Sequence, residues 1–204
     1  MARDLQPIVK RSRREGYALH PKAHKALVKR STIPGQHGRS QQRMKASQYS
    51  LQLREKQKVK RLYGLLERQF AKLMEEASRA KGQSGDRMLE FLERRLDNAV
   101  YRAGFAPSRR AARQLVTHGH FIVNDRRTDV PSMLLGDGDA VAVREGSRSL
   151  EYFKGLGDLA DARTSPNWLN RNTKDLSGVV QRLPERAEID GSLNEQLIVE
   201  YYSR

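Results

Sequence analysis

Residues 92–124 read LERRLDNAVYRAGFAPSRRAARQLVTHGHFIVN and decide the fold of the central part of the chain. Apolar residues recur at helical spacing over 89–103, and Gly104 follows them where a helix is usually capped by a residue with positive φ. Ser108 then stands in the N-cap position of a further helix, 109–118, which is rich in arginine. The stretch therefore predicts two helices joined by a short turn.

The sequence after these helices predicts a small antiparallel sheet. Gly119 lies where the chain leaves the second helix, and 121–124 (FIVN) is a short β-type run. The pair Asn-Asp at 124–125 suits a two-residue hairpin turn, and GDGD at 136–139 is a second turn before the alternating run 140–145. We therefore expect an α+β unit in which two helices pack on a small antiparallel sheet.

The flanking segments predict helices and a basic arm. Residues 47–81 have helical periodicity that Gly64 divides into two helices, with Ser47 or Ser50 as the first cap. Residues 1–46 show little period and contain several Pro and Gly, so we expect an extended basic arm that becomes ordered on a polyanion; a disordered tail is the alternative. Residues 193–202 fit either a helix or a strand, and we favour the helix.

These patterns predict a mostly helical chain around the small α+β domain. Trp168 is expected to dock on a core. The expected segments are a basic N-terminal arm (1–46), the first part of the helical domain (47–91), the small α+β domain (92–155) and a segment completing the helical domain (156–204).

Charge is the strongest indicator of a partner. The 204-residue chain has a net charge of +15, a pI of about 10.4 and a mean hydropathy of −0.77. The net charge is +14 over 1–61, zero over 62–100, +5 over 101–127 and −4 over 128–204. This distribution favours a nucleic acid as the partner over simple solubility. No apolar run is long enough for a bilayer, so we expect no membrane partner.

The pair His118 and His120 has a spacing that metal sites use, but it does not predict a metal here. Only three other histidines exist, the chain has no cysteine, and a glycine at the helix end should point the two rings apart. A histidine at a helix C-terminus is also favourable in itself. The run beginning at Asp137 lacks the glycine of a calcium loop, and no catalytic or nucleotide-binding motif is present. We expect no enzyme activity and no cofactor.

Arginine-rich helices indicate how a nucleic acid could be bound. Arg54, Lys58 and Arg61 share one helix face, and no acidic partner is evident in the sequence, so the stripe could face phosphates. Aromatic residues make up only 6%, which argues against stacking of single strands and favours folded RNA read by shape. A DNA-binding helix-turn-helix is the alternative for 90–118, although the helix carries few residues suited to reading bases.

The quoted stretch strongly resembles the RNA-binding domain named after bacterial ribosomal small-subunit protein four. That domain also occurs in RNA-modifying enzymes and assembly factors, so alone it implies only RNA binding. The rest of the chain resembles the ribosomal protein family itself. The motifs that carry this wider resemblance are SRREG (12–16), PGQHG (34–38), LQLREKQKVKRLYGLLERQF (51–70), LPER (183–186) and NEQLIVEYYSR (194–204).

The resemblance implies a structural protein of the small ribosomal subunit in the cytoplasm, with a helical domain into which the small α+β domain is inserted. Family members bind the 5′ domain of the small-subunit ribosomal RNA, nucleate assembly of the subunit body, contact small-subunit protein five and influence decoding accuracy. Arg39, Arg43 and Lys45 match the part of the arm at the channel through which mRNA enters. A free assembly factor or a module of an RNA-modifying enzyme is the alternative. DNA is not an expected partner.

One departure from the family concerns zinc. Many members carry four cysteines in the N-terminal arm, whereas Val9 and Ser12 stand at the paired positions here. The chain therefore looks like the zinc-free variant, and we expect no bound metal. The residues that we expect to bind RNA are Lys10, Arg11, Arg13, Arg14, Lys29, Arg30, Arg54, Lys58, Arg61, Arg95, Arg109, Arg110, Arg113, His118, His120 and Arg126.

Overall fold

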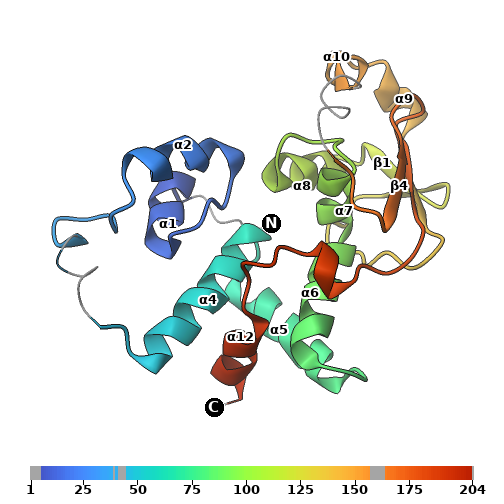
Figure 1. Cartoon of the computed structure of the whole chain (residues 1–204). Coiled ribbons are helices and arrows are strands. Elements are labelled where there is room, and N and C mark those ends of the chain that lie inside the picture. Colours follow the sequence, from blue (N-terminus) through green and yellow to red (C-terminus); the bar gives the residue numbers. More distant parts are fainter. Residues whose placement is uncertain (1–5, 39, 41–44, 157–163, 204) are drawn as a thin grey trace. The chain divides into compact units, whose positions relative to one another are not determined.

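The computed structural model describes residues 6–38, 40, 45–156 and 164–203. The chain forms two compact units (Figure 1). One unit comprises Met1–Met88 together with Gly191–Arg204, and the other comprises Leu89–Asp190. The second unit is therefore an insertion in the first. No helix in the described ranges combines the length and the apolar character needed to cross a bilayer.

The first unit is helical, as its periodicity predicts. The Ser47 side chain accepts a hydrogen bond from the Ser50 amide at the start of α4, which confirms the predicted cap. Gly64 adopts a φ of +69° between α4 and α5, as the division of this segment requires. Val59, Phe70 and Ile198 are fully buried in this unit. The helices of this unit are α1 (Ile8–Glu15), α2 (Pro21–Lys29), α4 (Gln48–Leu62), α5 (Glu67–Arg79) and α12 (Glu195–Tyr202), and α6 (Ser84–Arg94) leads into the second unit.

The C-terminal segment is a helix, which settles the choice left open by its sequence pattern. Asn194 caps α12, and its backbone amide donates to Glu55. The buried ammonium of Lys56 lies 4.4 Å from the centre of the Tyr201 ring and 2.6 Å from a carboxylate oxygen of Glu67. These contacts hold α12 against α4.

The N-terminal arm differs from the expected extended segment, because its residues 8–29 form two helices. Ser12 is fully buried; its hydroxyl donates to the Ile8 carbonyl (2.9 Å) and accepts from the Leu19 amide (3.3 Å). Leu19 and Ala23 are also buried, so α1 and α2 share a small core. The sequence of the arm lacks a long apolar repeat. Contacts between residues close together in the chain nevertheless pack α1 against α2 and order the arm.

The helix predicted over 89–103 is interrupted at Arg95. This residue has an extended backbone (ψ 136°) and forms an isolated antiparallel bridge with Leu134. The Leu96 amide donates to the Met133 carbonyl (2.8 Å), and the Leu135 amide donates to the Arg94 carbonyl (2.9 Å). The break leaves backbone groups without helical hydrogen-bond partners, and these tertiary hydrogen bonds satisfy them. Periodicity could not reveal this contact, since it lies about 40 residues away.

The second unit contains a five-stranded antiparallel sheet in the order β2-β1-β3-β5-β4. The predicted hairpin turn is confirmed: Asn124 and Asp125 have φ of 48° and 63°, and Val123 pairs with Arg126. Trp168 is 1% exposed in the core of this unit, as expected. The elements are α7 (Leu96–Arg102), α8 (Arg109–Thr117), β1 (Phe121–Val123), β2 (Arg126–Thr128), β3 (Ala140–Val143), α9 (Glu145–Arg148), α10 (Glu151–Lys154), β4 (Leu169–Asn172), β5 (Ser177–Val180) and the 3₁₀ helix η1 (Arg186–Glu188).

The segment 156–204 divides differently from the expected boundary. We expected all of it to complete the helical domain, but β4 and β5 extend the sheet beside β3, and only Gly191–Arg204 belongs to the helical unit. Val180 and Leu169 pair across these strands and are buried in the core beneath the sheet. Their burial there explains why the strands stay with the second unit.

Candidate nucleic-acid interface

Helix α8 carries the arginines that the sequence singled out, of which Arg109 and Arg113 are only 16% and 13% exposed. The Ser108 hydroxyl accepts a hydrogen bond from the Ala111 amide (3.2 Å) and fixes the start of the helix. Ala112 and Val116 are fully buried on the side that meets the core. Arg110 is exposed, and it forms no ion pair with a carboxylate in the described part of the chain.

A buried carboxylate, Asp97, holds two of the arginines. Its oxygens accept from Arg95 at 3.1 and 3.0 Å in a bidentate pair, and from Arg113 at 3.0 Å. The three side chains are 6%, 7% and 13% exposed. The structure therefore differs from our expectation for Arg95, which packs inside the unit because Asp97 directly compensates its charge.

A second buried carboxylate, Glu93, organises the neighbouring group. It accepts two hydrogen bonds from Arg102, at 2.9 and 2.7 Å, and one from the Asn98 amide group at 2.7 Å. The side-chain oxygen Oδ1 of Asn98 accepts from Arg109 (2.8 Å). The Arg109 guanidinium also lies 4.7 Å from the centre of the Tyr101 ring. Two carboxylates thus fix four guanidinium groups between α6, α7 and α8, which leaves a local excess of positive charge.

The two histidines of the opening stretch lie at the end of α8. Gly119 has a φ of +72°, as its predicted position after the helix requires, and the two rings lie 6.0 Å apart, measured between centres. His120 Nδ1 is 3.0 Å from the Ser147 hydroxyl, while His118 is exposed. Burial, then His118 and Arg144, lower the pKa of His120 below its ordinary value. The described residues contain no cluster of three or more groups suited to a metal ion.

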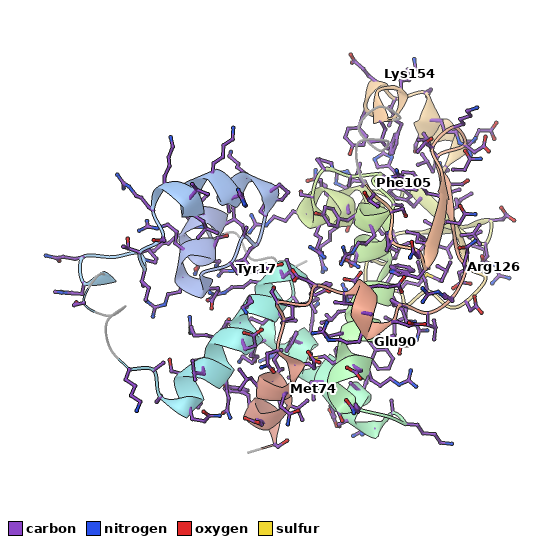
Figure 2. All side chains as sticks on the ribbon, in the orientation of Figure 1. Tyr17, Met74, Glu90, Phe105, Arg126 and Lys154 are labelled. Atoms are coloured by element: carbon purple, nitrogen blue, oxygen red, sulfur yellow. The ribbon has the colours of Figure 1, made fainter. Side chains whose placement is uncertain are left out.

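The hairpin and the start of α9 add cations that sequence reasoning missed. Arg126 is exposed on β2, at the outer edge of the hairpin (Figure 2). Its neighbour Arg127 folds back so that its guanidinium lies against Gly119. The Arg144 amide donates to the His120 carbonyl (2.8 Å), which places Arg144 beside the histidines. The hairpin turn could have indicated that Arg127 lies near the end of α8. The position of Arg144 beside His120, in contrast, depends on the register of β1 and β3.

In the helical unit the stripe on α4 has acidic partners, contrary to our expectation. Arg54 and Arg61 both bond the carboxylate of Glu15, whose side chain is fully buried. Burial raises the pKa of Glu15, although the two arginines oppose this change. Lys58 pairs with Glu55 one turn away at 2.7 Å. The stripe therefore anchors α1 to α4, and the sequence hid this because Glu15 lies 39 residues before Arg54.

The remaining candidates lie on the arm, where long basic side chains project from α1 and α2 (Figure 2). Arg11 donates to Gln6, and Arg13 donates to the Thr32 carbonyl at 3.1 and 2.9 Å. Arg39 and Arg43, which we assigned to mRNA, lie outside the described residues. The exposed candidates here are Lys10, Arg14, Lys29, Arg30 and Lys45.

Comparison with known proteins adds two family matches along the chain. Residues 3–93 match the family model described as the ribosomal protein S4/S9 N-terminal domain. Residues 94–141 match the S4 domain, and they contain α7, α8, β1, β2 and the start of β3. The second match therefore covers the buried ion pairs of Asp97 and the histidine pair.

Curated relatives match over the full length of the chain. The chain is 52% identical over 206 residues to small ribosomal subunit protein uS4 of Chloroflexus aurantiacus, and the match covers both chains completely. It is 52% identical over 210 residues to protein uS4A of Symbiobacterium thermophilum and 48% identical over 205 residues to uS4 of Chlorobaculum tepidum, again with both chains covered. Full coverage means that both units, and not the S4 domain alone, share this similarity.

Proposed function

The chain belongs to the uS4 family of small ribosomal subunit proteins, and from this premise we propose that it binds the 5′ domain of the small-subunit ribosomal RNA directly and nucleates assembly of the subunit body. Its relatives are named as ribosomal proteins, and enzymatic chemistry has no part in this function. The place of action is the ribosome in the cytoplasm.

The observation that carries this proposal is that both units have exposed cationic side chains. On the S4 domain, Arg110 is exposed on α8 and Arg126 is exposed on β2, while Glu93 and Asp97 hold further arginines in fixed orientations. On the arm, exposed lysines and arginines lie on α1 and α2. A folded RNA offers many phosphates that such cations can bind. Guanidinium groups that are already held in place bind phosphates without losing further side-chain entropy.

Three finer roles follow as proposals. The mRNA role rests on the resemblance of Arg39, Arg43 and Lys45 to the family's arm, and Lys45 is exposed. Residues 128–204 carry a net charge of −4, which suits contact with a basic neighbour such as small-subunit protein five. Through that contact we propose an influence on decoding accuracy.

Gradient sedimentation tests the proposed function against its alternatives. A tagged copy of the chain, expressed in cells, should migrate with small subunits after a high-salt wash, because a primary binder stays on the RNA. Recovery only as free protein would instead support a free assembly factor. Filter binding with Arg109→Ala and Arg113→Ala then tests α8, since unchanged affinity for ribosomal RNA would show that this helix does not face it.

A further inference from the structure

The end of α8 gathers cations around two residues, Gly119 and His120. A Cβ atom at Gly119 would lie only 2.8 Å from both Nε and Nη2 of Arg127, so this guanidinium rests directly on the glycine. The backbone amide of Arg144 donates to the His120 carbonyl, and, besides burial and His118, the charge of the Arg144 side chain helps to lower the pKa of His120. His118 completes the group, with its ring centre 6.0 Å from that of His120. Four cationic or ionisable residues from the end of α8, β2 and the start of α9 thus lie next to Gly119 or His120.

The charge of this group has no carboxylate partner within ion-pair distance among the described residues. The carbonyls at the end of α8 could attract cations, but those of Gln114, Leu115 and Val116 already accept from the amides of residues 118–120. This distinguishes the cluster from the arginines of α8, whose charges Glu93 and Asp97 partly compensate.

We propose that His118, His120, Arg127 and Arg144 form a phosphate-binding subsite for the RNA backbone, separate from the α8 arginines. The inference rests on the proposed binding of ribosomal RNA and specifies where one part of the backbone is held. Guanidinium groups bind phosphate oxygens in pairs, and a phosphate is the anion that such a set recognises. Gly119 has a role in this subsite, because a side chain there would displace Arg127.

The same geometry couples the subsite to pH. His120 faces His118 on α8, Arg144 and the Ser147 hydroxyl at α9, and the Phe153 ring on α10. In the free protein, burial and these cations disfavour its charged form. A bound phosphate supplies the missing negative charge and favours the imidazolium, so binding takes up a proton. Affinity should therefore rise as the pH falls from 8 to 6.

The test is filter binding of the full-length protein to a transcript of the ribosomal 5′ domain over a range of salt. Arg127→Gln and Arg144→Gln should each weaken binding about fivefold at physiological salt, as expected for an accessible charge pair. Each should also lower the steepness of the log–log salt dependence by about 0.7 to 0.9, the value of one phosphate contact. Arg127→Lys should retain the steepness. Lys81→Gln is the control, because it removes an exposed charge from a loop of the other unit.

A second measurement separates the histidines. The double variant His118→Gln, His120→Gln should bind with an affinity that no longer rises between pH 8 and pH 6, while melting curves confirm that each variant is folded. If the wild type binds but both arginine variants keep its affinity and salt dependence, the subsite is overturned and the proposed function stands. If the wild type does not bind the transcript, both are overturned.

Discussion

Asp97→Asn tests whether buried carboxylates organise the RNA-facing helix. The change removes one negative charge, so charge alone predicts tighter binding to RNA. The structure predicts the opposite, because Asp97 orients Arg113 and also compensates Arg95. Without the carboxylate, two largely buried guanidinium groups lose their charged partner, and α8 loses its ion pair to α7.

The expected magnitude follows from burial. Removing one partner of a buried ion pair costs about 3–5 kcal/mol, and Asn retains one acceptor, so we expect about 3 kcal/mol. For a unit of about 100 residues this lowers the melting temperature by about 12–20 °C. Thermal unfolding followed by circular dichroism gives this value, and filter binding at low temperature gives the affinity of the folded variant.

Asp129→Asn is the matched control, since it removes the same charge from an exposed loop of the same unit. It should leave the melting temperature unchanged and bind RNA at least as well as the wild type. If Asp97→Asn behaved in the same way, with tighter binding and a loss below about 1 kcal/mol, the carboxylate would have no organising role.

Three further predictions concern stability and metal. Partial burial raises the pKa of Glu67, but hydrogen bonds from Lys56, Lys60 and Tyr202 outweigh it and lower the pKa to about 2. Because its pKa is lowered, the ionised Glu67 stabilises the folded state; this stabilisation is present above the unfolded pKa near 4.5 and is lost as the pH falls toward 2. The side chain is 46% exposed, so we expect a contribution of only about 1 kcal/mol. The difference in unfolding free energy between the wild type and Glu67→Gln measures it. Ser12→Ala should cost about 1 kcal/mol and speed proteolysis within residues 8–29, whereas equal cleavage rates would show that its two hydrogen bonds do not hold the arm. The purified protein should contain no stoichiometric zinc, and elemental analysis giving one zinc per chain would refute this.

Local signals in the sequence were enough for much of the fold. Helix α8 begins after Ser108 and ends before Gly119, as predicted, and the positive φ values of Asn124 and Asp125 confirm the hairpin. Each of these features depends on a few adjacent residues. The break at Arg95 and the strands β4 and β5 depend on partners far along the chain, so periodicity alone could not predict them.

The candidate site was predicted less completely, for a physical reason. Sequence patterns show which residues are charged, but ion pairing is decided by tertiary contacts. Glu15 compensates Arg54 and Arg61, although the stripe on α4 had no evident acidic partner in sequence. Conversely, Arg127 and Arg144 join the histidines only through the register of the sheet.

The central claim is direct and selective binding of the 5′ domain of small-subunit ribosomal RNA. Competition filter binding tests it most directly, with the purified full-length protein, a labelled 5′-domain transcript, and unlabelled 5′-domain or 3′-domain transcripts of equal length as competitors. The 5′-domain competitor should displace the label at far lower concentration than the 3′-domain competitor, with steep dependence on salt. Equal displacement by the two transcripts would contradict the account.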